Sequence, residues 1–222
     1  MIIIHDERSS DSPYIETVMC GQTISAATTV RPAEYHWHMV LCRLDGKVQS
    51  LVVGPLTKSG FISYSAGAEL LWIKFALGTF MPDWPAKDFL DLETVLPDAS
   101  SQSFWLNGST WQFPNYDNVE IFVNRLVRDK VLVCDPLIKA ALQDQLPEMP
   151  PRTLRHRFLR ATGLSKGQIR QMMRAQQAQT LLQQGLPILD TVFAAGYFDQ
   201  PHLTRSLKQY VGLTPVQVIQ AS

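Results

Sequence analysis

One helix-sized pattern occurs twice in the last third of the chain, with the two copies 49 residues apart from Leu154 to Leu203. Apolar residues three or four positions apart share one face of a helix, so each copy predicts an amphipathic helix. Each copy ends in glycine, leucine and a hydroxyl residue, and glycine commonly ends a helix. The first copy contains Leu154, Phe158, Gly163, Leu164 and Ser165, and the second contains Leu203, Leu207, Gly212, Leu213 and Thr214. Because all five positions match at the same offset, the sequence predicts two copies of one structural unit.

The second copy carries the start and stop signals of a helix, a tight turn and another helix. Gly196 follows the short apolar run 188–195, and glycine adopts positive φ at little cost. Asp199 is expected to cap the next helix, and Pro201 is tolerated in its first turn because no intrahelical N–H is needed there. The residues expected to face inward are Leu203, Leu207 and Tyr210.

The opposite faces of these helices carry side chains suited to DNA. Arginine can bind guanine through two hydrogen bonds and glutamine can bind adenine in the same way, which reads base edges in the major groove. The candidate base contacts are Arg152, Arg155 and His156 in helix 151–161, and Gln200, Thr204 and Arg205 in the second helix. The candidate phosphate contacts, which set register without reading sequence, are Arg160, Lys166, Arg174 and Lys208. For either helix alone, the alternative is a charged surface that only confers solubility.

The segments around these helices are predicted to support them. Asp135 should cap a helix that begins at Pro136, and segment 147–150 should form the turn before the first reading helix. Ser165 should cap a long helix, 166–184, and Gly185 and Pro187 should stop this helix and begin the next. A stiff connection of this kind would place the two reading helices at major-groove faces about 10 bp apart. Its inward residues are predicted to be Ile169, Met172, Met173, Gln176, Ala178, Leu181 and Leu182.

From about Pro136 to Gln220 the sequence resembles the tandem helix-turn-helix DNA-binding domain of the AraC/XylS family of transcription regulators. The motifs that carry the resemblance are 152–158, Ala161 to Ser165, Gly196 to Leu203 and Gly212 to Pro215. The first turn departs from the family pattern, because Glu148 and Pro150 stand where glycine and serine are usual. The resemblance implies promoter or operator DNA as a partner and a small-molecule effector, and it raises RNA polymerase and a second copy of the chain as further partners.

Charge divides the chain into two parts. Residues 1–134 contain 10 Lys and Arg against 15 Asp and Glu, whereas residues 135–222 contain 10 against 5. A basic segment suits phosphate contacts, and an acidic one is repelled by the same backbone. The charge division therefore predicts two functions in two parts of the chain. With what the resemblance implies, we expect an effector-binding domain at 1–115, a linker helix at 116–134 and the DNA-binding domain at 135–222.

The first domain is predicted to be β-rich. Two apolar runs within 36–53 flank Asp45 and Gly46, a pair suited to a type I′ hairpin turn. Further strands are expected at 15–25, 61–64 and 70–75, with a turn at Ala66 and Gly67. The predicted fold class is α+β: a cupin-like or β-barrel sensor, as the resemblance loosely implies, followed by an all-α double helix-turn-helix domain.

The end of the first domain is less regular in sequence, and a helix is expected to follow it. Residues 83–115 predict loops with a short helix at 86–92. Asp117, with Glu120 three residues later, predicts a capping box for a helix that runs to about Lys130. Its apolar face, Val119, Phe122, Val123 and Leu126, can pack on the helix's own domain or serve a dimer contact or signal relay.

The candidate effector-binding residues are His36, Trp37, His38 and Trp72. Small-molecule pockets are usually apolar and aromatic with a few polar groups, although large aromatics also dominate ordinary cores. Two histidines at i and i+2 would share a strand face, as ligands of one metal ion require. The metal motif of cupins continues with a carboxylate several residues later, but Cys42 and Arg43 occupy the candidate positions here. We therefore predict neither a metal nor a cofactor.

The remaining composition argues for a binding protein. Cys20, Cys42 and Cys134 are odd in number and widely spaced, which indicates neither a disulfide framework nor a zinc ribbon. The sequence has no catalytic constellation and no apolar run long enough for a membrane span, so we expect a cytoplasmic, non-enzymatic protein. The alternative is a small-molecule-binding or metal-dependent cupin-like β-barrel whose helical tail mediates protein contacts.

Overall fold

The computed structural model describes residues 2–145 and 149–221 and divides into two compact units. Unit 1 consists of Met1–Ala27, His36–Pro55 and Ser63–Gly163, and unit 2 consists of Thr28–Tyr35, Leu56–Ile62 and Leu164–Ser222. Each unit thus combines segments that are distant in sequence. These units differ in their bounds from the predicted domains, 1–115, 116–134 and 135–222. The predicted domains describe which parts function separately, and they stay a prediction.

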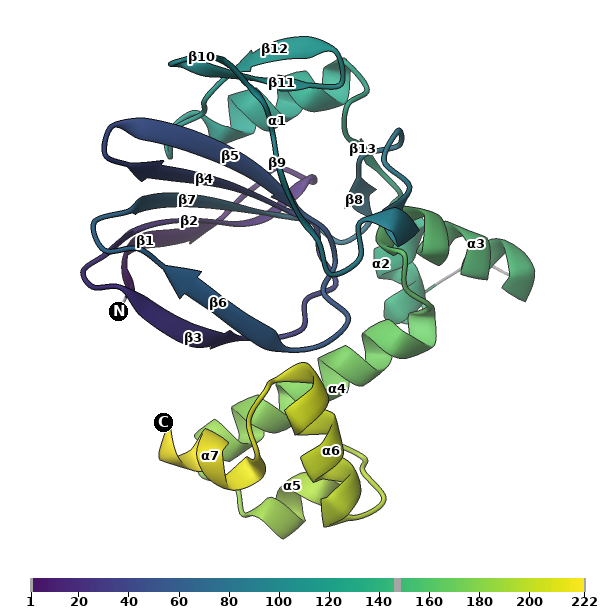
Figure 1. The fold of residues 1–222 in the computed structure, drawn as a ribbon. Helices are drawn as coiled ribbons and strands as arrows, with labels where there is room; N and C mark the ends of the chain where they lie inside the picture. The colour runs from purple at the N-terminus through teal and green to yellow at the C-terminus, as the bar shows by residue number, and fades with distance from the viewer. Residues whose placement is uncertain (1, 146–148, 222) are drawn as a thin grey trace. The chain divides into compact units, whose positions relative to one another are not determined.

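Unit 1 is built on a six-stranded antiparallel sheet with the strand order β1-β2-β7-β4-β5-β9 (Figure 1). Its central pairing places Met39 beside Ile73 and Val18 beside Ile73, and all three side chains are fully buried. Alternate residues of a strand share a face, so these positions mark the core face of the sheet. The strands are β1 (Ile2–Ser9), β2 (Ile15–Thr23), β4 (His38–Leu44), β5 (Lys47–Val53), β7 (Glu69–Phe75) and β9 (Glu93–Val95).

The hairpin between β4 and β5 has the predicted turn. Asp45 has φ +50° and Gly46 has φ +77°, the two positive values that a type I′ turn requires. The strands at 15–25, 61–64 and 70–75 and the turn at Gly67 are also confirmed. Among the described residues, the sheets do not close into a barrel; the predicted β-rich N-terminal region is confirmed as antiparallel sheets.

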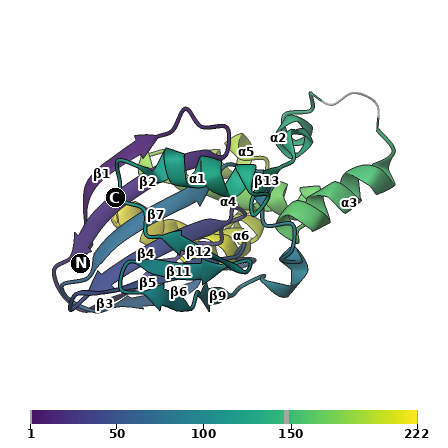
Figure 2. The same cartoon turned by 90° about the horizontal axis from the view of Figure 1, so that it is seen from above.

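A second sheet and a helix cover one face of the large sheet in unit 1 (Figures 1 and 2). Residues 83–115 were expected to be irregular, but they form β9 and a three-stranded sheet of β10 (Asp98–Ser100), β11 (Ser103–Leu106) and β12 (Ser109–Gln112). The helix predicted at 86–92 is a single 3₁₀ turn, η1 (Ala86–Asp88). The ring of Phe122 in α1 (Val119–Arg128) lies 6.2 Å from the rings of both Phe104 and Trp111.

The predicted cap of α1 is wrong. Asn118, not Asp117, is the N-cap, and it makes no side-chain cap hydrogen bond to the helix. Glu120 binds Arg8 and Ser10 of the β1 region instead of its own helix end. The buried face Val119, Phe122, Val123 and Leu126 is confirmed.

The first pair of C-terminal helices belongs to unit 1. Asp135 caps α2 (Pro136–Leu142) by accepting a hydrogen bond from the Leu137 N–H, as predicted. Just before it, β13 (Val133–Cys134) pairs with β8 (Thr79–Phe80). The next helix is α3 (Pro151–Thr162). Of the turn predicted at 147–150, Pro147 and Glu148 lie outside the described residues.

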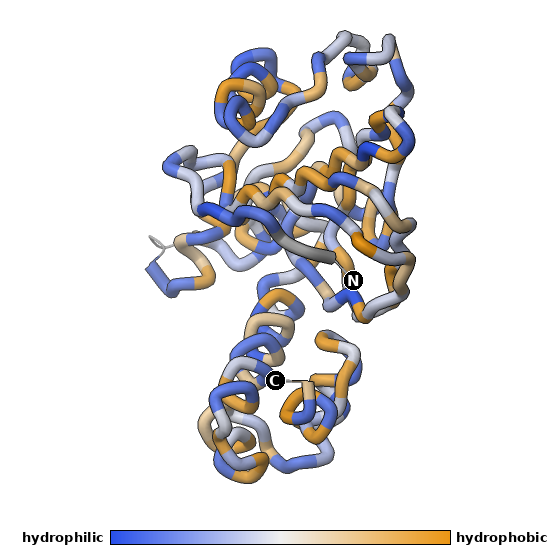
Figure 3. The backbone as a smooth tube through the Cα atoms, turned by 90° about the vertical axis from the view of Figure 1, so that its left-hand side faces the viewer, coloured by the Kyte–Doolittle hydropathy of each residue, from blue (hydrophilic) through white to orange (hydrophobic). Residues whose placement is uncertain are grey.

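Unit 2 combines a two-stranded ribbon with four helices. The ribbon pairs β3 (Ala27–Arg31) with β6 (Gly60–Tyr64), and residues 28–31 and 60–62 of these strands belong to unit 2. In the helices, hydrophobic and hydrophilic residues are interspersed along the chain (Figure 3), as expected of helices with one buried and one exposed face. The helices are α4 (Lys166–Gln183), α5 (Ile188–Ala194), α6 (Gln200–Tyr210) and α7 (Pro215–Gln220).

Candidate nucleic-acid interface

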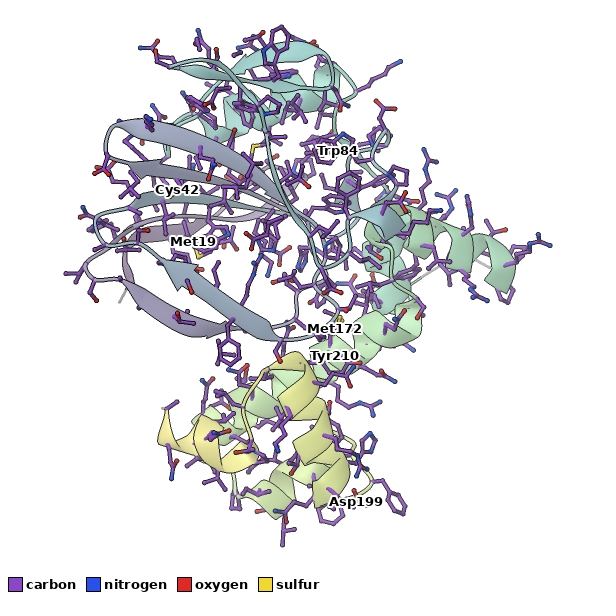
Figure 4. The ribbon with its side chains drawn as sticks, viewed as in Figure 1. Met19, Cys42, Trp84, Met172, Asp199 and Tyr210 are labelled. Carbon is purple, nitrogen blue, oxygen red and sulfur yellow. The ribbon has the colours of Figure 1, made fainter. Side chains whose placement is uncertain are left out.

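The α5–turn–α6 segment forms as the sequence predicts. Gly196 has φ +70° in the turn, and the Asp199 carboxylate accepts a hydrogen bond from the His202 N–H at 2.7 Å. Leu203 and Leu207 are fully buried and Tyr210 is nearly so. Figure 4 shows Asp199 and Tyr210 at opposite ends of α6. The helix is therefore anchored along one side, at its N-cap and at its last turn.

Polar contacts inside unit 2 fix the position of this turn. The Tyr197 and Ser206 hydroxyls lie 2.8 Å apart in the interior, and burial raises the pKa of Tyr197. The Arg174 guanidinium lies 5.6 Å from the centre of the Tyr197 ring. The Tyr210 hydroxyl donates to Gln171 of α4 at 3.0 Å. Buried, hydrogen-bonded side chains of this kind hold α5 and α6 against α4.

The outer face of α6 carries the predicted donors. Gln200, Arg205 and Lys208 are exposed, and Thr204 is half-buried. Two further residues were not singled out from the sequence: His202 is exposed beside Arg205, and Phe198 is 90% exposed just before the helix. From sequence alone, an aromatic residue in this motif is expected to be buried, so no sequence pattern distinguishes the exposed Phe198 from a core side chain.

The C-terminal end of α6 is completed by two segments from the first third of the chain, both in unit 2. The Ala33 N–H donates to the Tyr210 carbonyl at 2.7 Å, and the Ser59 N–H donates to the Gln209 carbonyl at 2.7 Å. The Ser59 hydroxyl also donates to the Lys208 carbonyl at 2.9 Å. The last carbonyls of a helix have no intrahelical partner, so these donors satisfy groups that otherwise need water.

The first predicted reading helix, α3, presents Arg152, Arg155 and His156 on its exposed side. Phe158, Ala161 and Thr162 are buried, and Gly163 ends the helix at φ +69° as predicted. The structure thus places three predicted base contacts on the exposed face of α3, and Gln200 and Arg205 on that of α6.

Some predicted phosphate contacts already have partners within their own unit. Arg160 lies over the Phe80 ring at 5.5 Å, and its neighbour Arg157 bonds to Asp135 at 2.8 Å. Arg174 reaches the Gly196 carbonyl at 3.5 Å as well as the Tyr197 ring. Lys166 and Arg174 are half-buried, whereas Arg160 and Lys208 are exposed. Among the predicted phosphate contacts, Lys208 is therefore the one whose side chain is least held by other described residues.

The connection that follows α3 is capped as expected. The Ser165 hydroxyl accepts the Gln168 N–H at 3.2 Å, and Gln168 returns a hydrogen bond to the Ser165 N–H, which completes a capping box. Met172 is buried, but Met173 is 40% exposed, so its predicted inward position is wrong. Figure 4 shows Met172 on α4.

The structure contradicts one expectation about the candidate effector residues, the shared strand face of the two histidines. His36 lies in a bend before β4, so His36 and His38 do not share a strand face. Trp37 is 2% exposed and donates its indole N–H to the Ala161 carbonyl at 3.0 Å. Trp72 is half-buried, with its ring 6.4 Å from that of Tyr64. Among the described residues, no three His, Cys, Asp or Glu side chains gather as metal ligands.

Unit 1 also contains a cavity of about 320 Å³ that none of those four residues lines. Strands β4 and β7 and the segment before α1 contribute to its wall. The Arg43 and Glu69 side chains lie 3.7 Å apart in the wall and remain more than half exposed. The main lining residues are Leu41, Arg43, Glu69, Leu71, Phe113 and Tyr116.

In the described part of the chain, no helix combines the length and apolar character needed to cross a membrane.

Comparison with known proteins identifies the C-terminal segment. A family model described as a helix-turn-helix domain matches residues 148–221, which span α3 to α7. No curated protein matches the chain, and no solved structure matches it. Domains of this type are typical of non-enzymatic, DNA-binding transcription regulators. Residues 148–221 are an AraC-type helix-turn-helix DNA-binding domain.

Proposed function

We propose that the protein binds a specific promoter or operator sequence and regulates transcription, with α3 and α6 reading base edges in the major groove. One observation carries this proposal: α6 buries Leu203 and Leu207 while it exposes Gln200 and Arg205, within a segment of the matching family. Such a helix can enter a groove without losing its packing, because the two functions use opposite sides.

The proposed roles follow from side-chain chemistry. Arg152, Arg155 and His156 of α3, and Gln200, Thr204 and Arg205 of α6, would contact bases, because they offer donors suited to guanine or adenine. Arg160, Lys166, Arg174 and Lys208 would contact phosphates, which position the protein without reading sequence. Of these, Arg160 and Arg174 would have to reach DNA while keeping their aromatic contacts.

Binding to a randomised DNA duplex library tests the proposal. The full chain should enrich a defined sequence, and Arg205→Ala should cost about 1 to 3 kcal/mol on that sequence and flatten discrimination at one position. Lys208→Ala is the matched control from the same exposed face. It should weaken all sequences alike and reduce the slope of affinity against salt by about one unit. Equal losses on every sequence for Arg205→Ala would make it a phosphate contact, and no enrichment by the full chain would refute the function.

We also propose that a small molecule binds unit 1 and alters DNA binding. Support comes from the cavity, whose Leu41, Leu71 and Phe113 are apolar and whose Arg43 and Glu69 are charged, the composition common in small-molecule sites. The earlier candidates His36, Trp37, His38 and Trp72 stay a separate prediction. The cupin-like character of this domain, a homodimer and a contact with RNA polymerase also stay predictions that follow from the resemblance.

A metabolite library screened by thermal unfolding tests the ligand proposal. A ligand at 100 times its Kd raises the stability of the folded state by about 2.7 kcal/mol. Val48→Trp, which would fill the cavity from the half-buried wall position, should abolish the shift. Trp72→Phe would weaken the shift instead if the site were at the earlier candidates His36, Trp37, His38 and Trp72. The ligand must also change DNA affinity, because a ligand with equal affinity for both states shifts nothing.

A further inference from the structure

Trp37 connects the β sheet of unit 1 to the first reading helix. Its indole N–H donates to the Ala161 carbonyl at 3.0 Å, although the two residues are 124 positions apart in sequence. The side chain is 2% exposed, and the hydrogen bond is buried. Trp37 stands directly before β4 (His38–Leu44), so its backbone continues into the middle of the six-stranded sheet.

The acceptor is one of the carbonyls that a helix cannot satisfy by itself. Ala161 lies in the last turn of α3 (Pro151–Thr162), where the final four carbonyls have no i+4 amide within the helix. A buried carbonyl without a donor is costly, so the indole supplies what the end of α3 needs. The contact therefore determines where this helix end can rest.

The same helix end is packed closely against η1 (Ala86–Asp88). A Cβ built on Gly163 would lie 2.8 Å from Leu90 Cδ2 and 3.0 Å from the Ala86 carbonyl oxygen. The Trp37 ring lies 5.9 Å from that of Phe89, which follows η1. The indole, the η1 backbone and the glycine thus surround one point, the C-terminal end of α3.

We propose that Trp37 is a positioning residue for DNA recognition by α3, acting from the β sheet through the Ala161 carbonyl. The inference rests on the proposed function, because it requires that α3 reads DNA. Arg152, Arg155 and His156 lie on the same rigid helix as Ala161, so a change in the position of its end moves all three. Trp37 would touch neither DNA nor any reacting group.

The experiment compares Trp37→Phe with Trp111→Phe in the full chain. Trp111 is a matched control, because its buried indole donates to the Leu106 carbonyl at 3.1 Å within the three-stranded sheet. Base-by-base affinity is measured on the selected duplex, with Arg155→Ala and Arg205→Ala defining the positions that α3 and α6 read. Trp37→Phe should reduce discrimination about 2- to 10-fold at the Arg155 positions and leave the Arg205 positions unchanged, as loss of one typical hydrogen bond implies.

Each other outcome overturns a different statement. Equal effects of Trp37→Phe and Trp111→Phe, or a uniform loss at all positions, overturn the positioning role while α3 still reads DNA. Absence of any position-specific effect for Arg155→Ala overturns the reading role of α3, and the positioning role with it.

Trp37→Phe could lower the melting temperature more than Trp111→Phe does. In that case, hydrogen exchange distinguishes a positioning role of Trp37 from a general destabilisation of the fold. The expected loss of protection is confined to the last turn of α3. Loss spread over the whole six-stranded sheet would identify Trp37 as an ordinary core residue and overturn the proposal.

Discussion

At the scale of single residues, Glu120 shows a local expectation overridden by a distant partner. Its spacing from Asp117 suits a capping box, yet its carboxylate binds the Arg8 guanidinium and accepts the Ser10 hydroxyl at 2.9 Å. Arg8 also donates to the Tyr116 carbonyl at 2.9 Å. The hydrogen bond from Arg8 lowers the pKa of Glu120 to about 2. This carboxylate therefore links β1 to α1 rather than capping α1.

Glu120→Gln should reduce stability at neutral pH and have less effect in acid. A carboxylate whose pKa is lowered on folding stabilises the protein above its unfolded pKa of roughly 4.3, and the stabilisation is lost as pH falls towards about 2. We expect a loss of about 1 to 2 kcal/mol at pH 7, less than the full pKa change implies, because solvent screens the partly exposed pair.

Denaturant unfolding of the wild type and Glu120→Gln between pH 7 and pH 3 checks this. Asp117→Asn is a control at the residue that the structure does not use as a cap. A difference between wild type and Glu120→Gln that stays constant with pH would contradict the assignment of the stabilisation to this ion pair.

Local signals predicted the helix ends well where the partner is near in sequence. Asp199 and Ser165 each bind an N–H three residues later, and Gly163 and Gly196 adopt the positive φ expected of them. Glu120 and Trp37 could not be predicted in the same way, because their partners lie 112 and 124 residues away. Sequence patterns record neighbours along the chain and not those brought together by the sheet.

At the scale of elements, the end of α3 should tolerate substitution less well than the turn before α6. Gly163 and Gly196 have nearly equal φ, +69° and +70°, but a Cβ would collide with Leu90 and the η1 backbone only at Gly163. Gly196→Ala should cost about 1 to 2 kcal/mol from the left-handed conformation alone. Gly163→Ala should cost more, because it adds a steric clash to the same strain.

Thermal unfolding of the two variants measures the difference directly, because each serves as the control for the other. Equal losses of stability would show that α3 does not pack closely against η1.

The sequence predicted the C-terminal helices better than the small sheets. The helices carry an apolar stripe over ten or more residues, as in α6 and α4, whereas β10 to β12 are three- or four-residue strands rich in serine. Strands this short offer too few alternations to register as a pattern. The two segments that bind the end of α6, around Ala33 and Ser59, carry no sequence signal, because they bind mainly through backbone N–H groups.

At the scale of the whole molecule, the segment that the family model matches does not contain all the residues that hold its helices in place. Residues 148–221 lack Trp37 and η1, which contact α3, and lack Ala33 and Ser59, which bind the end of α6. A fragment of residues 148–221 should therefore show weaker amide protection at the ends of α3 and α6 than the full chain. Hydrogen exchange on both proteins checks this, with the centre of α4 as internal reference. Equal protection at these helix ends would show that the N-terminal segments do not stabilise them.

The central claim is that two separate helices of this protein read one DNA duplex. The most direct test measures affinity at every base pair of the selected site for wild type, Arg155→Ala and Arg205→Ala. The claim predicts two blocks of lost discrimination about 10 bp apart, one for each variant. Loss at the same base pairs in both variants, or discrimination unchanged in either, would contradict it.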